Sequence, residues 1–304
     1  MESGPMKKFS TLLPRHGRRT FTTVRIFSLV ILLTLLFYAQ ESHAQRWPLE
    51  RGYTYLRLGL NGFRGDQYFS GTGSEIPVQR LEENTWRFYS EYGYSRYVTG
   101  IVSVPAYRTL LVQENADAPV QRVESPGDIE LGLRIGIYAS DDDVILLSGY
   151  FGIPLGETAN RDGLWSGDNE YDQTVMIGYG RHIKSLATRL SLQGGYHFRN
   201  DGYSDEVLIN GNVELQPLDF LELTLRVRYL QSQENGDPAF SGGHYGFASN
   251  DRRFLMYGPE VALWITRGFG INASMYAVTD ARNMPGATLF SAGFFLLVAP
   301  SGMQ

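Results

Sequence analysis

The sequence contains no cysteine among its 304 residues, so it can form neither disulfide bonds nor cysteine-ligated metal sites. Charged residues are also scarce, at 19% against the roughly 25% of an average soluble domain. After residue 44 no apolar segment reaches the roughly 20 residues that a membrane helix needs. These absences exclude a disulfide scaffold and a helical membrane domain. They leave a soluble β-protein or a membrane β-barrel, and the length fits two ordinary domains or one large barrel.

Lysine is nearly absent beyond residue 44, where only Lys184 occurs. The first 44 residues hold six of the 27 basic and two of the 32 acidic residues, which leaves 21 basic and 30 acidic residues and a formal charge of about −9. A nucleic-acid-binding protein would show a basic stripe, and scattered arginines in an acidic chain do not make one. The sequence therefore predicts no nucleic-acid partner.

The amino terminus has the three parts of a secretory signal peptide. Basic residues precede an apolar run of about 14 residues, 26–39. Ser42-His43-Ala44 then places small residues at the two positions that signal peptidase reads. Because the run is short for a membrane anchor, we expect residues 1–44 to be a cleaved signal peptide and residues 45–304 to be the mature protein. No cysteine follows the run, which excludes a lipoprotein.

Residues 127–138 show the pattern that organises the rest of the chain. From Ile129 every second residue is a large aliphatic, and the residues between them are charged, small or phenolic. Successive side chains of a β-strand point to opposite faces, so this segment would have one apolar and one polar face. Such a strand suits either a soluble sandwich or a barrel whose apolar face meets lipid.

The same alternation recurs often enough to predict twelve strands. They span approximately 53–63, 86–94, 97–111, 127–138, 145–155, 171–181, 187–198, 206–216, 221–229, 254–266, 269–279 and 288–298. Pro105 and Pro259 weaken two of them, because proline cannot donate to a sheet ladder. Counts of 10 or 14 strands are the alternatives.

The connections between these strands alternate in length. Short turns follow the even-numbered strands, and the longest loops, 64–84, 112–126, 157–170 and 231–252, follow odd-numbered ones. A sandwich has no reason to collect its long loops at one end, whereas outer-membrane barrels combine short periplasmic turns with longer outside loops. The sequence therefore predicts an all-β fold, a transmembrane antiparallel β-barrel of about 12 strands in the bacterial outer membrane.

In such a barrel the polar residues between the lipid-facing ones line the lumen. Glutamates and arginines there can pair simply to satisfy buried charge, or can set the width and field of a selective pore. The expected lumen-lining residues are Arg57, Arg87, Glu91, Glu130, Arg134, Tyr138, Arg189, His197, Glu214, Glu222, Arg226 and Arg228, with Glu260 in addition. Eight-stranded barrels are filled by side chains and sixteen-stranded ones hold an aqueous channel, so twelve strands predict a narrow passage.

The sequence gives little support to catalysis. A serine hydrolase needs a serine beside an oriented histidine, and no spacing around His182, His197 or His244 is specific to that arrangement. Three acids at 141–143 are typical of a solvated turn rather than of a calcium site. Gly194-Gly195 lacks the strand, loop and helix of a phosphate-binding motif. We therefore predict no catalytic residue, no metal and no cofactor, and we expect outer-membrane lipid, a small-molecule solute and the barrel-assembly machinery as partners.

Three short motifs connect the chain to a family. Pro126-Gly127-Asp128-Ile129-Glu130-Leu131-Gly132, then Gly152-Ile153-Pro154-Leu155-Gly156, then the glycine-bounded segment 167–180 resemble the transporter-like outer-membrane proteins named for the meta-pathway of phenol degradation. In that family a Gly-Asp opens an alternating strand and a Pro-X-Gly closes the next. The resemblance covers roughly residue 127 to the carboxyl terminus. It implies an envelope barrel that passes small compounds, aromatic ones among them, and it assigns no binding residue.

The predicted function is accordingly a passive channel or uptake protein for small molecules, including hydrophobic or aromatic ones. Two alternatives stay open. One is a structural or adhesive barrel that acts through its outside loops. The other is a lipid-modifying barrel enzyme, which would lose its activity on His197→Ala.

Overall fold

The computed structural model describes residues 48–158 and 163–300. The expected signal peptide, residues 1–44, lies outside the described residues. What is described belongs to one compact unit that contains strands and a single 3₁₀ turn, η1 (Lys184–Leu186). Within the described ranges, no helix has the length and hydropathy of a membrane span.

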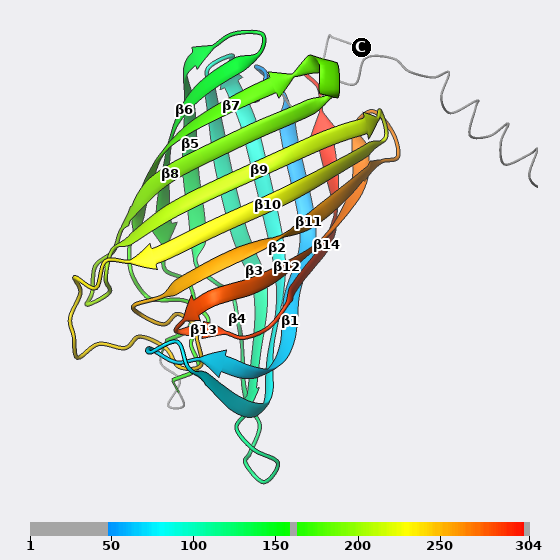
Figure 1. Cartoon of the computed structure of the whole chain (residues 1–304). Helices are drawn as coiled ribbons and strands as arrows, with labels where there is room; N and C mark the ends of the chain where they lie inside the picture. Colours follow the sequence, from blue (N-terminus) through cyan, green and yellow to red (C-terminus); the bar gives the residue numbers. More distant parts are fainter. Residues whose placement is uncertain (1–47, 159–162, 301–304) are drawn as a thin grey trace, which may run out of the picture. The chain divides into compact units, whose positions relative to one another are not determined.

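Twelve long antiparallel strands form one sheet, as the alternation predicts. In chain order they are β1 (Thr54–Phe69), β2 (Glu75–Ser95), β3 (Val98–Gln113), β5 (Ile129–Ala139), β6 (Asp143–Ile153), β7 (Gln173–Ile183), β8 (Thr188–Phe198), β9 (Glu206–Leu218), β10 (Leu221–Ser232), β11 (Arg253–Trp264), β12 (Phe269–Arg282) and β14 (Leu289–Val298). Two short strands, β4 (Gln121–Ser125) and β13 (Met284–Pro285), pair with β3 and β1. Because β1 pairs with both β2 and β14, the sheet closes into a barrel (Figure 1).

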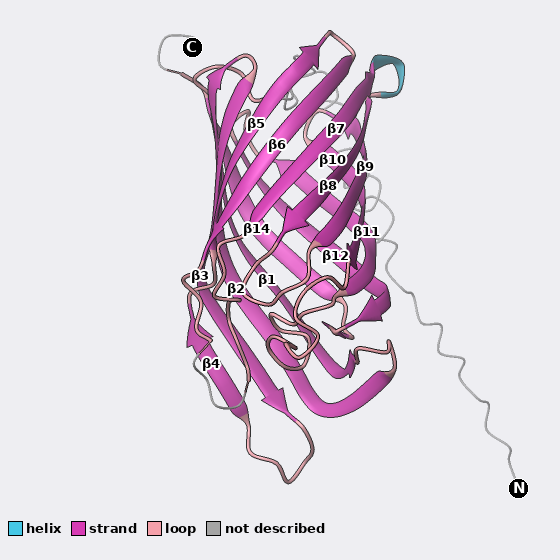
Figure 2. Ribbon diagram, turned by 90° about the vertical axis from the view of Figure 1, so that its left-hand side faces the viewer, coloured by secondary structure: helices cyan, strands magenta, loops and turns pink. Residues whose placement is uncertain are grey.

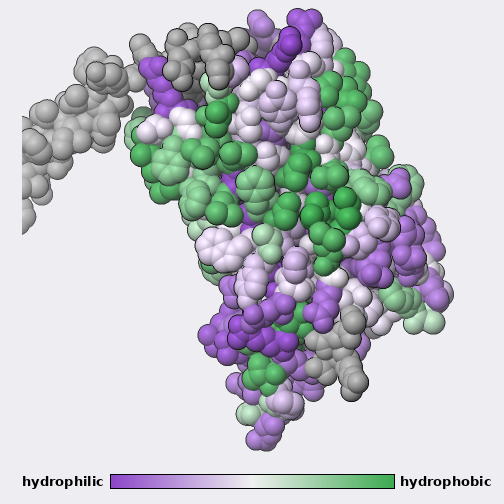
Figure 3. All heavy atoms as spheres, turned by 180° about the vertical axis from the view of Figure 1, so that it is seen from behind, coloured by the Kyte–Doolittle hydropathy of each residue, from purple (hydrophilic) through white to green (hydrophobic). Residues whose placement is uncertain are grey.

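The apolar residues of the strands face outward. On β5, Leu131 and Leu133 are 41% and 44% exposed, and the same is true of the alternating aliphatics of the neighbouring strands. Figure 3 shows that apolar residues gather over the middle and upper part of one face, while the lower end is hydrophilic. A soluble protein would bury this surface, whereas an apolar band around a closed barrel matches the hydrocarbon layer of a membrane.

Short turns and long loops lie at opposite ends of the barrel (Figure 2). The turns β2–β3, β5–β6 and β9–β10 close one end, and the connections 154–172 and 233–252 leave from the other. We call these the short-turn end and the long-loop end. In bacterial barrels they correspond to the periplasmic and the outer side.

The first hairpin differs from the expectation of an exposed loop over 64–84. β1 continues to Phe69 and β2 starts at Glu75, so only 70–74 turn the chain. β2 has 21 residues, about twice the roughly 9 to 11 that cross a membrane, so its first half projects beyond the hydrocarbon layer. The expected loop 112–126 likewise contains β4. Both differences have the same physical reason. The inward side chains of the extended parts of β2 and β3, such as Leu81, are buried by loop residues from far along the chain.

The two prolines that weakened the strand predictions are accommodated within strands. At Pro105 the pairing of β2 with β3 shifts, because Trp86 is opposite Tyr107 while Arg87 is opposite Pro105, which leaves one extra residue as a bulge. Pro259 keeps its partner Leu225 on β10, and the pairing with β12 continues on either side of it. A missing N–H is thus tolerated where the ladder is already interrupted.

Candidate functional site: the lumen and its loop plug

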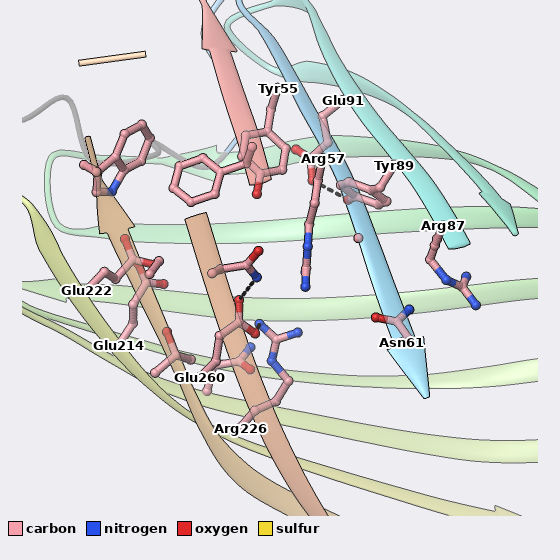
Figure 4. Close-up of a pocket in the computed structure, with 17 residues that line it drawn as sticks. Tyr55, Arg57, Asn61, Arg87, Tyr89, Glu91, Glu214, Glu222, Arg226 and Glu260 are labelled. Carbon is pink, nitrogen blue, oxygen red and sulfur yellow. Dashed lines mark hydrogen bonds and ion pairs between the residues drawn. The ribbon is translucent and has the colours of Figure 1, made fainter. Parts of the chain in front are cut away.

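A cavity of about 340 Å³ lies inside the barrel toward the short-turn end (Figure 4). Its lining includes seven of the ionisable residues expected in the lumen: Arg57, Arg87, Glu91, Glu214, Glu222, Arg226 and Glu260. They come from β1, β2, β9, β10 and β11, at positions that alternate with the lipid-facing residues. Strand periodicity therefore places charge inside the barrel and hydrocarbon outside it.

Several lumen charges are held in ion pairs. Arg134 Nη1 lies 3.1 Å from Glu91 Oε2, and Arg226 Nη2 lies 3.3 Å from Glu260 Oε2. Arg189 bridges two carboxylates, since its Nη2 contacts Glu214 and lies 3.3 Å from Glu222 Oε2. Arg134 and Arg189, which do not line the cavity, thus fix the carboxylates that do.

Two cavity arginines have a different environment. Arg57 Nη2 donates to Ser291 Oγ at 3.0 Å, and Arg87 Nη1 donates to Ser103 Oγ at 3.0 Å. Within the described residues, neither guanidinium forms an ion pair with a carboxylate. Their charges are therefore available to a molecule in the cavity.

Glu130 and Arg228 lie outside the cavity lining, although their side chains alternate with the lipid-facing residues of β5 and β10. Both side chains are exposed, and Arg228 lies over the ring of Phe254, with its Cζ 5.9 Å from the ring centroid. Because they alternate with lipid-facing residues, these two side chains are exposed to the lumen and not to the outer surface.

Tyr138 does not line the lumen. The pairing of β5 with β6 shifts between Gly136 and Tyr138, because Gly136 is opposite Leu146 while Tyr138 is opposite Ile145. This bulge moves Tyr138 to the outer face, where 52% of it is exposed. The strict alternation assumed from the sequence therefore fails here, as it does at the bulge beside Pro105.

Four aromatic residues line the cavity near the short-turn end. The ring centroid of Phe295 lies 6.0 Å from that of Tyr55 and 4.6 Å from that of Trp264, and Tyr89 lies 6.3 Å from Tyr55. These four aromatic residues were not among the predicted lumen-lining residues. For Tyr55, Tyr89 and Phe295 the signal was present, since each occupies an inward position of an alternating strand.

At the long-loop end, residues 163–170 and 240–250 fold into the mouth of the barrel and form what we call the loop plug. Leu164 and Phe247 are almost completely buried and pack against Leu81 and Leu110, which point inward from β2 and β3. The ring of Phe247 stacks on Phe63 of β1 at 5.9 Å. The plug thus has an apolar core, although the overall composition of its two loops is polar.

Asp128 fastens the plug to the barrel wall. Its Oδ1 accepts hydrogen bonds from the N–H groups of Leu155 at 2.9 Å and Gly156 at 2.8 Å, and its Oδ2 accepts one from Asp168 at 2.9 Å. A β-carbon on Gly167 would collide with this carboxylate. The three motifs that carried the family resemblance therefore meet around one side chain.

A second fastening comes from Arg108 on β3. Its Nη1 donates to the backbone oxygen of Ser166 at 2.6 Å, and its Nε and Nη2 both donate to Glu83 at 3.1 Å. The Ser166 hydroxyl in turn accepts a hydrogen bond from the N–H of Glu157 at 2.8 Å. Neither Arg108 nor Ser166 could be singled out from sequence, because their partners lie far away along the chain.

A buried charge cluster with Arg199 at its centre connects two plug residues, Asp168 and Glu170, to the barrel wall. The Arg199 Nη2 is 2.9 Å from Asp168, its Nε donates to Glu170 at 2.5 Å, and its Nη1 is 3.4 Å from Glu206. Arg252 Nε also donates to Glu206, at 2.9 Å. Burial raises the pKa of Glu170 to about 7, and the neighbouring Arg199 opposes this shift. The sequence offered no sign of this cluster apart from His197.

His197 lies at the edge of that cluster. Its Nδ1 is 2.9 Å from Glu206 and its Nε2 is 3.1 Å from Asp172, so both ring nitrogens contact carboxylates. A general base must keep one nitrogen for its nucleophile. In the described part of the chain, no group of His, Asp and Glu has the arrangement of a metal site.

No family model matches the sequence, and no curated protein matches it. The structure resembles an outer membrane channel from Pseudomonas putida F1 with a TM-score of 0.63 at 12% identity, over 86% of this chain and 100% of that one. It also matches the NanC porin, with a TM-score of 0.49 at 7% identity over 79% and 98% of the two chains. The translocator domain of the autotransporter NalP from Neisseria meningitidis has a TM-score of 0.48 at 10% identity, over 91% and 96%. The first similarity, together with the closed sheet and its apolar outer band, defines the fold as that of an outer-membrane β-barrel.

Proposed function

We propose that this protein is an outer-membrane channel that passes small molecules through its lumen. The observation that supports this proposal is the cavity of about 340 Å³ inside a closed barrel, whose lining includes charged side chains held in ion pairs. A volume of this size suits a small solute. The Pseudomonas putida protein that shares the fold is itself described as an outer membrane channel.

We extend the proposal to solutes with an aromatic part, as the family resemblance implies. The aromatic surfaces of Tyr55, Trp264 and Phe295 support this, because flat rings bind other flat rings in offset or edge-to-face arrangements. The lumen also keeps polar and apolar surface side by side, which suits a small amphipathic molecule better than a fully apolar one.

Reconstitution tests the proposal. Residues 45–304 in planar bilayers should give discrete conductance steps, and proteoliposomes should swell in isosmotic arabinose. Conductance should rise in Asp128→Asn, in which the attachment of the plug is weakened, and should stay unchanged in the matched control Asp219→Asn. If neither the wild type nor Asp128→Asn conducts, the barrel is a structural or adhesive one that acts through its loops. Recovery of the mature chain from the soluble periplasm would contradict a membrane barrel altogether.

The enzyme alternative is the weaker one. Its best candidate was His197, yet both nitrogens of this ring contact carboxylates, and no serine hydroxyl is among its hydrogen-bond partners. We therefore expect purified protein to have no lipid-modifying activity for His197→Ala to remove. A measurable phospholipase or acyltransferase activity that this substitution abolishes would reverse the assignment.

A further inference from the structure

The fixed charges of the cavity are divided between two sides of the barrel. Arg57 and Arg87 project from β1 and β2, whereas Glu214, Glu222 and Glu260 project from β9, β10 and β11 (Figure 4). In the ring of twelve long strands β9 lies six places from β2, on the opposite side of the lumen, whereas β11 lies three places from β1. We call the side of the lumen that carries Arg57 and Arg87 the arginine wall, and the side that carries the three glutamates the glutamate wall.

The ion pairs do not cancel this separation. On the arginine wall, Glu91 is matched by Arg134, which leaves the two charges of Arg57 and Arg87. On the glutamate wall, the three carboxylates are matched by only two guanidinium groups, those of Arg189 and Arg226. One wall therefore carries an excess of positive charge and the other an excess of negative charge.

Opposed charges across a narrow lumen create a field perpendicular to the barrel axis. Low-dielectric walls concentrate such a field, so a solute with one charge is attracted by one wall and repelled by the other. A solute that carries both charges can orient along the field and gain from both walls. From this arrangement we infer that the cavity is a binding site for small zwitterions, with a carboxylate toward the arginine wall and an ammonium group toward the glutamate wall. The inference rests on the proposed channel function and specifies its solute.

The aromatic residues restrict the class further. Tyr55, Trp264 and Phe295 line the same cavity as the two charged walls and lie toward the short-turn end. A zwitterion with an aromatic side group can place its ring against them while its charges lie between the walls. The class that fits is that of aromatic α-amino acids.

Calorimetric titration of the detergent-solubilised protein with three ligands of similar size tests the inference. L-Phenylalanine carries both charges, 3-phenylpropanoate lacks the ammonium group, and phenethylamine lacks the carboxylate. We expect phenylalanine to bind at least about tenfold more tightly than either analogue, because one hydrogen bond to a charged group contributes a factor of about ten to a hundred. Equal affinity for all three ligands, or no binding of phenylalanine, would overturn the inference.

Two variants then locate the charges. Arg57→Gln should weaken phenylalanine and 3-phenylpropanoate by about tenfold, and it should not weaken phenethylamine, because the arginine wall repels an ammonium group. Glu222→Gln should weaken phenylalanine and phenethylamine and spare 3-phenylpropanoate, and Arg189 keeps Glu214 as a partner in this variant. Glu75→Gln, at an exposed position where β2 begins at the long-loop end, is the control that should change none of the three. Parallel losses for all ligands in both charge variants would contradict the two-wall arrangement.

Conductance separates this inference from the function on which it rests. Arabinose swelling and single-channel steps without any preference for phenylalanine would refute the zwitterion site and leave the channel intact. Phenylalanine binding with the predicted response to Arg57→Gln, in a barrel that does not conduct, would support the site and refute the channel.

Discussion

The side chain of Asp128 holds the backbone of Gly156, 28 residues further along the chain, through a 2.8 Å hydrogen bond to its Oδ1. Asp128 immediately precedes β5, and Gly156 follows β6, so the bond spans the long-loop end of one hairpin. Its second oxygen holds Asp168, within the loop plug. One carboxylate therefore connects the start of β5, the end of β6 and the loop plug, and it acts alongside Arg108 and Arg199, which also hold the plug.

Asp128→Asn should loosen the plug. The substitution removes the charge and one acceptor oxygen, so at least one of the three backbone N–H groups loses its partner. Hydrogen bonds to charged groups contribute about 1.5–3 kcal/mol each, and attachment of the loop should weaken by a comparable amount. Limited proteolysis in proteoliposomes should cut the loop 154–172 faster than in the wild type. Asp219→Asn, in the turn between β9 and β10 at the opposite end, should leave the rate unchanged.

Gly167→Ala offers an independent route to the same state. The added β-carbon would collide with the Asp128 carboxylate, so either the side chain or the loop must move. We expect faster cleavage of the loop, as in Asp128→Asn, and no additional effect when the two substitutions are combined, since residues that share a contact are not additive. Strictly additive effects would show that Asp128 and Gly167 act separately.

Retention of the plug should depend on pH. The pKa of Glu170 is raised to about 7 from an ordinary value of 4.5, so the folded loop binds this proton more tightly than the released loop does. Its contribution to closure is complete below about pH 4.5 and is lost as the pH rises through about 7. Amide hydrogen exchange of residues 163–172 should therefore accelerate between pH 5 and 8, after correction for the intrinsic exchange rate. Glu170→Gln should flatten this dependence, whereas Glu157→Gln, an exposed carboxylate on the same loop, should preserve it.

Arg199→Met should destabilise the barrel strongly. Only 1% of the Arg199 side chain is exposed, and its removal leaves Asp168, Glu170 and Glu206 without their shared cation. Breaking a buried ion pair in this way costs about 3–5 kcal/mol, which urea unfolding in lipid vesicles can measure. Arg181→Met is the control: that guanidinium is 56% exposed and lies 3.8 Å from Asp143, and such surface pairs contribute about 0–1 kcal/mol. Equal losses in the two variants would show that the cluster is not a cooperative network.

Leu133→Arg tests which face of β5 meets lipid. Leu133 lies on the outer face among other exposed aliphatics, so a charge there would have to enter the hydrocarbon layer. The expected cost is about 2–4 kcal/mol near the membrane midplane, and Leu133→Ala separates this cost from the loss of side-chain size. Folding of Leu133→Arg in lipid with wild-type stability would mean that the strand is inverted.

The wall of the barrel could be predicted from sequence because its physics is local. Alternation from Ile129 to Ile135 determines which side chains face out, and the structure places them there. The exception is Tyr138, since a bulge depends on how β5 and β6 pair and leaves no trace in the periodicity of β5 alone. Within the strands, the sequence therefore fails to predict which way a side chain faces where the pairing of two strands, and not the periodicity of one, determines it.

The plug could not be predicted for a related reason. Leu164 and Phe247 belong to short apolar or aromatic groups in otherwise polar loops, and the inward faces of β1, β2 and β3 bury them. Asp128 was visible as part of a motif, but its role was not, because its partners follow 27 to 40 residues later in the chain. The cavity charges were predictable as a set, whereas their division into two walls required the strand order.

The seam between β1 and β14 joins the first long strand to the last, with Thr54 opposite Val298. Contact order is therefore high, and this ladder can close only after every intervening strand has been laid down. Until then both edges present unpaired N–H and C=O groups, each of which costs several kcal/mol in hydrocarbon and can template pairing with a second chain. The rate of folding should thus be limited by the final pairing of β1 with β14. The unclosed sheet, rather than the finished barrel, is the species that an assembly partner would have to shield.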